Sequence, residues 1–269
     1  MTYQTIGSEP FSWAAKSYDE IKRVGEEPGS VLVVPVGSIE QHGHHLSVAT
    51  DIVCADAISR EAVDAVYEEI PVLVVPPVWM GVSPHHLNLG GTLSVSFETM
   101  IELLSDIIKT GVDNGFDAVI LVNGHGGNGS ALGGVAKTVG HQYHPDVEVL
   151  TLTYFGLAEP IAEELRDSDV GGMNHGGELE TSLMMHLRPD LVDETRAEAE
   201  YLDEPYTHGY DGMFEGGPLS VYRSEEEYSK TGAVGAPECA SPEKGEKIFQ
   251  FVSDELSTIL REIHEQNGT

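Results

Sequence analysis

Cysteine is nearly absent from this chain. Its 269 residues include two, Cys54 and Cys239, which lie far apart with no second cysteine nearby. A disulfide framework and a thiolate metal site are therefore excluded, and any metal would be held by oxygen and nitrogen. No apolar run approaches the roughly 18–20 residues that a bilayer-spanning helix needs. Residues 1–6 also lack the basic-then-apolar pattern of a secretory signal, so we expect a cytoplasmic protein.

Basic residues are also scarce. The chain has 14 Lys and Arg against 45 Asp and Glu, a formal net charge of −31. The acidic residues are dispersed in pairs, such as Asp19-Glu20 and Glu163-Glu164, which indicates a folded body with an acidic, salt-adapted surface rather than a disordered tail. Because such a surface repels nucleic acid and anionic membranes, we expect neither as a partner.

Apolar strand-like segments alternate with amphipathic helical patterns. Strands are predicted over 31–36, 71–75, 118–122 and 147–153. Helices are predicted over 53–69, 96–114, 130–141, 159–167, 178–188 and from Pro242 onward, with Asp51 and Ser96 as N-caps. This alternation is typical of an α/β fold with a mainly parallel sheet, and the lack of a repeat or linker favours a single domain over 1–269. Residues 190–240 are polar and rich in Gly and Pro, so we expect a long excursion that could contact a neighbouring subunit.

The densest group of metal-type side chains follows the first predicted strand. The loop after that strand contains Glu40, His42, His44, His45 and Asp51, with little apolar bulk between them. A hydrophobic core needs the opposite composition, whereas a divalent metal needs carboxylate and imidazole ligands held together. This loop is therefore a candidate metal site.

A second segment is expected at the same edge of the sheet. His125 follows the predicted strand 118–122. The carboxyl ends of parallel strands meet at one edge, where open α/β sheets bind their ligands. We therefore expect His125 to lie beside the loop that follows strand 31–36.

A third contribution comes from the helix that begins near Glu178. On this helix Glu180 shares a face with Leu183, Met184 and Leu187, which should turn inward. A buried carboxylate needs a partner, so Glu180 is predicted to face a cation. Glu178 lies about 160° around the helix and is expected to point elsewhere and to need no cation.

These segments together predict a dinuclear site. Glu40, His42, Asp51, His125 and Glu180 would be enough for two adjacent divalent ions with one carboxylate bridging them. Such a pair can activate a water and polarise a carbonyl. Mixed carboxylate and imidazole ligands suit zinc, manganese and iron alike. The residues therefore predict a metal-dependent hydrolase.

The remaining histidines divide into two groups. His175 lies in the loop before the predicted helix 178–188 and could move a proton to the leaving nitrogen. His44, His45, His85 and His86, each taken alone, are more typical of solvated loop residues.

A nucleotide site is the alternative interpretation. Residues 124–129 match G-x-G-x-x-G between a predicted strand and a helix, as in a nicotinamide-binding oxidoreductase. The next strand carries no acid placed to bind a ribose hydroxyl, since Glu148 stands at its beginning. Ser130 stands where a P-loop requires Lys. A nicotinamide enzyme would bind NAD(H) and ignore chelators, and a non-catalytic binding module would keep metal but hydrolyse nothing.

Five ordered segments over roughly residues 30–260 resemble the creatininase family, the creatinine amidohydrolase-type metal hydrolases. They are Gly37-Ser-Ile-Glu-Gln-His-Gly-His-His-Leu46 with Asp51, Gly81-Val-Ser-Pro-His-His86 with Gly91-Thr92, Asn123-Gly-His-Gly-Gly-Asn128, His175-Gly-Gly-Glu-Leu-Glu-Thr-Ser182, and the segment 232–245. The resemblance implies a three-layer α/β/α fold with a mainly parallel sheet and two divalent ions per chain. Those ions are zinc or manganese, with iron in some relatives, and the assembly is often a hexamer.

The resemblance also implies roles for individual residues. Glu40, His42, Asp51 and His125 match metal ligands, with Asp51 as the bridge. His175 matches the histidine that transfers protons.

The same resemblance places the substrate pocket. Ser83 and His86 fall in the segment that lines it, and Gly126, Gly127 and Asn128 are further candidates for substrate binding.

One departure from the family pattern affects both the ligands and the substrate. Creatininases carry Tyr and Glu directly after the loop histidine, and that Glu binds metal, whereas Gly126 and Gly127 stand here. We assign the missing ligand to Glu180, which also counts as a catalytic residue. The loss argues against creatinine itself and favours the reaction common to the wider family, cleavage of a C–N bond in a cyclic amide, formamide or small peptide amide. Formamidopyrimidine-nucleotide deformylases and a peptidase that trims a cofactor precursor are the alternatives within that family.

Overall fold

The sheet and its register bring two strand ends together. A computed structural model describes residues 9–203, 206, 208–209, 213–214 and 218–268. Within them, four parallel strands lie in the order β2-β1-β3-β4. They are β1 Val31–Val36, β2 Val72–Val74, β3 Ala118–Asn123 and β4 Glu148–Thr153. Val36 pairs with Asn123, so β1 and β3 end side by side. The strand order reverses between these two strands, which is where α/β sheets bind ligands.

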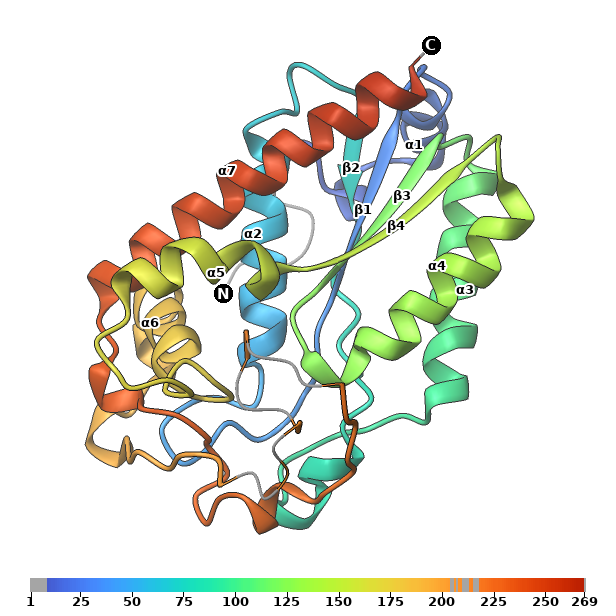
Figure 1. The fold of residues 1–269 in the computed structure, drawn as a ribbon. Helices are drawn as coiled ribbons and strands as arrows, with labels where there is room; N and C mark the ends of the chain where they lie inside the picture. Colours follow the sequence, from blue (N-terminus) through green and yellow to red (C-terminus); the bar gives the residue numbers. More distant parts are fainter. Residues whose placement is uncertain (1–8, 204–205, 207, 210–212, 215–217, 269) are drawn as a thin grey trace.

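Helices cover both faces of the sheet (Figure 1). They are α1 Tyr18–Gly25, α2 Thr50–Asp64, α3 Phe97–Asp113, α4 Gly129–Tyr143, α5 Tyr154–Leu165, α6 Glu178–Leu187 and α7 Pro242–Asn267. The group α2, α5, α6 and α7 lies on one side, and the group α1, α3 and α4 lies on the other. The predicted three-layer α/β/α fold with a parallel sheet is confirmed.

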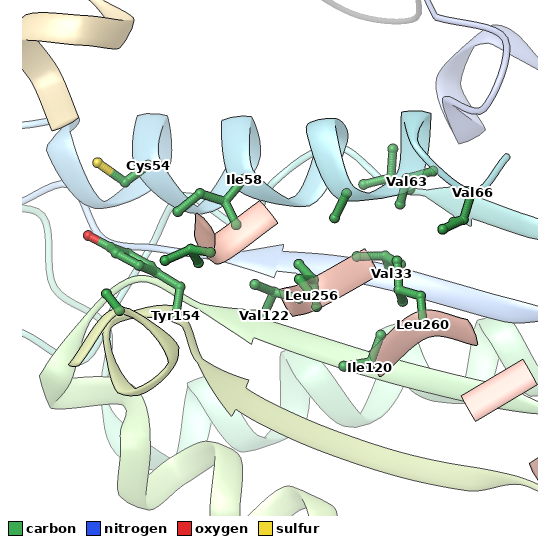
Figure 2. Close-up of a cluster of buried hydrophobic side chains, with 14 of the residues drawn as sticks. Val33, Cys54, Ile58, Val63, Val66, Ile120, Val122, Tyr154, Leu256 and Leu260 are labelled. Carbon is green, nitrogen blue, oxygen red and sulfur yellow. The ribbon is translucent and has the colours of Figure 1, made fainter. Parts of the chain in front are cut away.

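Alternating strand residues form a separate core on each face. Val33 and Ile120 belong to the cluster under α2 and α7, whereas Leu32 and Leu121 belong to the cluster under α3 and α4. Successive side chains of a strand point to opposite faces, and strands covered on both sides are apolar throughout. Figure 2 shows Ile58 of α2 above the first of these clusters. The continuous apolar segments of the sequence follow from this double burial.

Two predicted boundaries differ from the structure in ways that matter for the site. α2 begins at Thr50 rather than Val53, so Asp51 lies in its first turn and the N-cap is Ala49. The prediction that Asp51 caps this helix is therefore wrong, and its side chain is available to the site. The cap at Ser96 is confirmed, since its hydroxyl accepts a hydrogen bond of 3.2 Å from the nitrogen of Thr99. Helix α1 was not predicted. Helix α5 begins at Tyr154, directly after β4, rather than at residue 159 as predicted.

The regular structure of the loops, over the residues that the structure describes, consists of short 3-10 helices. They span Trp13–Ala15, Pro84–Leu89, Gly126–Asn128, Pro189–Leu191, Glu194–Arg196, Glu225–Glu227 and Pro237–Cys239. Between residues 192 and 240 the described part of the chain has no α-helix or named strand, as expected for a long excursion. Among the helices in the described ranges, none combines the length and apolarity needed to cross a membrane.

Candidate metal centre

The site begins in the loop between β1 and α2. Glu40 and His42 lie in this loop and Asp51 lies in the first turn of α2, with side chains no more than 2 % exposed. The loop needs glycine at Gly37, because a Cβ there would come within 2.8 Å of the nitrogen of Ile52. α2 therefore starts directly beside the exit of β1. The positive end of a helix also favours a carboxylate in its first turn.

Asp51 lies between two histidines that come from different loops. Its Oδ1 is 2.9 Å from His42 Nε2, and its Oδ2 is 3.3 Å from His125 Nδ1. Glu40 Oε2 lies 3.0 Å from the same nitrogen of His125. The loops after β1 and β3 therefore meet, and one carboxylate reaches both halves of the site.

α6 adds a third carboxylate. Glu180 is 3 % exposed, and its Oε2 lies 3.7 Å from His42 Nε2. The same oxygen accepts a hydrogen bond of 2.6 Å from the nitrogen of Gly176. Leu183 and Met184 are fully buried one turn further along, which is the inward face that the helical spacing predicted.

Glu178 points away from this cluster, but it does contact a cation. Its side chain is fully buried, and Lys244 of α7 donates to its carboxylate. The backbone nitrogens of Asp167 and Ser168 donate to it as well, at 3.0 and 3.1 Å. The expectation that Glu178 needs no cation is therefore wrong. The first turn of α6 packs against α7, so carboxylates on both of its faces are buried.

The donor atoms fit a divalent cation. Glu40, Asp51 and His125 each offer a ligand atom within 4.8 Å of the others, and so do His42, His175 and Glu180. Within the described residues, Glu40 Oε1, His42 Nε2 and Asp51 Oδ2 are buried without a hydrogen-bond partner. Buried polar atoms are rarely left unpaired, and an unpaired buried carboxylate is costly.

The electrostatics of the cluster favour added positive charge. Burial raises the pKa of Glu40, but the adjacent His125 outweighs it and holds that pKa well below its usual range. Burial lowers the pKa of His42, but the carboxylates of Asp51 and Glu180 raise it to about 10. Burial raises the pKa of Glu180 to about 7. The three carboxylates therefore produce a field that attracts cations.

Gln41 fixes the orientation of two further histidines. Its amide nitrogen donates to the carbonyl of Gly232 at 2.9 Å and to His86 Nδ1 at 2.8 Å, which uses both of its N–H bonds. The proton of His86 is therefore on Nε2, which lies 3.4 Å from Glu40 Oε1. His175 Nε2 donates to the carbonyl of Gln41 at 2.8 Å. Its Nδ1 is then the basic nitrogen, 3.7 Å from Glu40 Oε1.

The chain is similar in sequence to proteins of one known family. The profile of the creatininase family, described as creatinine amidohydrolase, matches residues 14–260. The chain belongs to the creatininase family. It is 29 % identical over 247 residues to the creatinine amidohydrolase of Pseudomonas putida, covering 86 % of this chain and 89 % of that one. It is 31 % identical over 249 residues to the mycofactocin precursor peptide peptidase of Mycolicibacterium smegmatis, covering 88 % and 87 %.

Solved creatininases share the fold. A structure described as creatininase Mn has a TM-score of 0.80 at 24 % identity, covering 94 % of this chain and 98 % of that one. A mutant creatininase of the Zn-Zn type has a TM-score of 0.77 at 24 % identity, with the same coverage. The predicted family is confirmed, and this creatininase-family chain is a hydrolase that acts on carbon–nitrogen bonds.

Glu40, Asp51, His125, His175 and Glu180 of this creatininase-family chain line one part of a cavity of about 570 Å³, whereas His42 lies behind them. Other parts of the wall come from the excursion after α6, including Leu202, Leu219, Arg223, Glu225 and Tyr228. Glu225 is 8 % exposed, and its carboxylate lies within 4.8 Å of ring nitrogens of His85 and His86. Burial raises the pKa of Glu225 to about 7. In the sequence this residue belongs to an acidic run that looks solvated, so nothing there marked it.

Two predicted substrate-binding residues lie behind the ligands. Ser83 is not among the cavity-lining residues. Its hydroxyl donates to Glu40 Oε2 at 2.6 Å and lies 3.0 Å from His125 Nε2. Asn128 is also absent from the lining, and its amide donates to the carbonyl of Gly37 at 3.0 Å. Both side chains support the ligand loops.

The other pocket candidates do reach the cavity. His86, Gly126 and Gly127 are among the residues that line it. His44 is exposed, as expected for a loop residue. His45 and His86 are 2 % exposed, contrary to the expectation that they are solvated. His45 is covered by α6, where its Nε2 lies 3.0 Å from the hydroxyl of Thr181.

Proposed function

We propose that this chain is a metal-dependent amidohydrolase that uses two divalent ions. The observation that carries the proposal is the set of buried, unpartnered atoms Glu40 Oε1, His42 Nε2 and Asp51 Oδ2, which converge with two further ligand-type side chains. A buried carboxylate oxygen that lacks a hydrogen-bond partner is costly unless a cation lies beside it.

Each ion takes its ligands from one half of the cluster. Glu40 and His125 would hold one ion, and His42 and Glu180 would hold the other. Asp51 would contribute to both, since its Oδ1 faces His42 and its Oδ2 faces His125. Zinc and manganese are the preferred metals, with iron as a third possibility, because all three accept carboxylate and imidazole ligands.

Two side chains of the protein, His175 and Ser83, would then transfer the proton and orient Glu40. The bound ions supply an activated water and polarise the amide carbonyl. His175 accepts a proton at Nδ1 and delivers it to the leaving nitrogen, while its Nε2 stays hydrogen-bonded to the carbonyl of Gln41. Ser83 orients Glu40 through its 2.6 Å hydrogen bond.

The substrate is a cyclic amide, a formamide or a small peptide amide. The relatives' names support this range, because they include both a creatinine amidohydrolase and a peptide peptidase. Gly126 also supports a substrate other than creatinine. Creatininases carry Tyr at this position, whereas here the space is open, because Gly126 lines the cavity and a Cβ built on it meets nothing within 4 Å. By its family resemblance the chain also forms a homo-oligomer, which light scattering tests.

Metal analysis of matched variants tests the proposal. We expect two equivalents of divalent metal per chain in wild type purified without chelators. Asp51→Asn should lose both, because Asp51 is the shared ligand. Asp56→Asn, on the same helix but paired with Arg60 at 2.9 Å, should keep both. Metal-free wild type, or full retention by Asp51→Asn, would contradict the proposal.

An activity panel tests the reaction. Creatinine, a formamidopyrimidine and short peptide amides are each incubated with metal-loaded wild type and with His175→Asn. We expect hydrolysis of at least one substrate, and a loss of about 10²–10⁴-fold in kcat for His175→Asn with metal content unchanged. Metal retention with no hydrolysis of any substrate would indicate a non-catalytic binding module.

A further inference from the structure

The cavity has one permanent cation among its described lining residues. Glu40, Asp51, Glu180 and Glu225 contribute carboxylates to this wall, whereas Arg223 contributes the sole guanidinium or ammonium group. Divalent ions bound as proposed above would neutralise the first three carboxylates, but they would not account for Arg223. An arginine that faces a substrate cavity is a ready partner for a carboxylate or phosphate.

We propose that Arg223 anchors an anionic group of the substrate, so that the enzyme acts on amides that carry a carboxylate or a phosphate. This inference rests on the proposed amidohydrolase function and specifies its substrate class. The anionic group would lie at Arg223, and the scissile amide would lie at the carboxylate and histidine cluster.

Arg223 lacks a close acidic partner of its own. Its nearest carboxylate among the described residues belongs to Glu227. The distance from Arg223 Nη1 to Glu227 Oε2 is 3.9 Å, which is too long for a hydrogen bond. Glu227 instead accepts a 3.0 Å hydrogen bond from the nitrogen of Ser224. The Nε of Arg223 is buried without a hydrogen-bond partner in the described part of the chain. By contrast, Arg60 and Arg261 each lie 2.7 Å from a carboxylate oxygen.

Two aromatic rings hold the guanidinium in place. Its Cζ lies 5.9 Å from the ring centroid of Tyr206 and 5.8 Å from that of Tyr228. Such contacts stabilise the cation through the ring faces without consuming its N–H donors. The side chain is 27 % exposed, so part of the donor fork remains accessible from the cavity. An arginine held in this way is preorganised for an anion.

The segment that carries Arg223 is tied to the catalytic end of the cavity. Asn88 donates to Ser224 Oγ at 3.1 Å and to Glu226 Oε1 at 2.8 Å. The next residue, Glu225, approaches His85 and His86. Arg223 is therefore fixed relative to the histidines and does not depend on a free loop.

Part of the cavity wall is apolar. Phe155, Leu202, Leu219 and Val221 all line the cavity. These side chains bind hydrocarbon and offer no side-chain hydrogen bond to a polar middle. The inferred substrate thus has an amide at one end, an apolar body, and an anionic group at the other end.

Matched substrate pairs test the inference with metal-loaded protein. The two members of each pair differ in one anionic group: a short peptide with a free carboxylate and its carboxamide, hydantoin acetic acid and its amide, and a formamidopyrimidine nucleotide and its nucleoside. We expect wild type to prefer the charged member of one pair by roughly 10- to 100-fold in kcat/KM. The pair that shows the preference identifies the anion as carboxylate or phosphate.

Variants assign the preference to Arg223. Arg223→Gln should lower kcat/KM for the charged member by the same factor and leave the neutral member within about twofold. Arg223→Lys should keep only part of the preference, because lysine lacks the fork. Arg196→Gln, an exposed arginine on the same excursion, is the control and should behave as wild type.

The outcomes separate this inference from the function on which it rests. Equal kcat/KM for both members of every pair in wild type, or an equal loss for both members in Arg223→Gln, would overturn it. Binding of each pair is also measured by calorimetry. If nothing is hydrolysed, the proposed function fails, but the binding preference of wild type over Arg223→Gln still decides the role of Arg223. If Arg223→Gln does not fold, Arg223→Lys supplies the same comparison.

Discussion

Replacing Lys244 by Met should destabilise the fold without touching the metal centre. Lys244 donates to the fully buried carboxylate of Glu178, and its own side chain is 12 % exposed. Methionine keeps much of the side-chain volume but removes the charge. Glu178 would then be a buried carboxylate with only the backbone nitrogens of Asp167 and Ser168 as partners.

The magnitude follows from how this pair is buried. Removing one partner of a buried ion pair costs about 3–5 kcal/mol, because the remaining charge is left uncompensated. The two backbone donors still stabilise Glu178, which places the cost at the lower end, about 3 kcal/mol. For a chain of this length a change of 1 kcal/mol shifts Tm by about 2 °C, so we expect Lys244→Met to melt about 6 °C lower.

Calorimetry and urea denaturation measure this change. Two further variants test whether it comes from the buried charge of Glu178. Arg188→Met breaks an exposed pair, with side chains 47 % and 61 % exposed, and should cost less than about 1 kcal/mol. Combining Lys244→Met with Glu178→Gln removes the buried charge, so the double variant should be more stable than Lys244→Met alone. A double variant no more stable than Lys244→Met would refute the reasoning, since the loss would then come from packing. Metal content should stay at the wild-type level throughout.

Two further predictions concern the residues that support Glu40 and His125 in the candidate metal centre. Gly127→Ala should lower metal content, because a Cβ there would lie 2.4 Å from His125 Nε2, whereas Gly126→Ala meets nothing within 4 Å and should retain metal and fold. Metal analysis and Tm check this pair, and equal retention by both variants would contradict it. Ser83→Ala removes the 2.6 Å hydrogen bond to Glu40 and should weaken metal affinity by about 10–100-fold at unchanged Tm, as measured by chelator competition. An unchanged affinity would show that Ser83 does not orient the ligand.

Local patterns predicted the sheet well, and they indicated several residues that meet in the candidate metal centre. The apolar segments predicted β1, β2 and β3 because each of these strands is buried on both faces, whereas β4 is only partly buried and alternates Leu with Thr. Glu40, His42 and His125 stood out because polar residues directly after parallel strands gather at one edge. Glu180 followed from helical spacing, since the apolar residues on its face show which side turns inward.

Contacts between distant segments could not be predicted in the same way. Glu178 was expected to need no cation, because the sequence does not show that α7 returns to place Lys244 beside it. His86 was expected to be solvated, but Gln41 contacts its ring and the excursion after α6 encloses the cavity that it lines. Ser83 was expected to face substrate, yet its hydroxyl supports Glu40 from behind.

The sequence alone determined the alternation of elements, the carboxylate and imidazole chemistry of the candidate site and the edge of the sheet where those side chains meet, because all three depend on residue type and local period. Only the tertiary structure decided which cation lies beside Glu178, which nitrogen of His175 is basic, and what the excursion after α6 adds to the cavity. Those features depend on contacts between segments many residues apart, such as the 2.8 Å hydrogen bond of His175 to the carbonyl of Gln41. Arg223 and Glu225 belong to the second group, since nothing in their local sequence marks them as residues of the site.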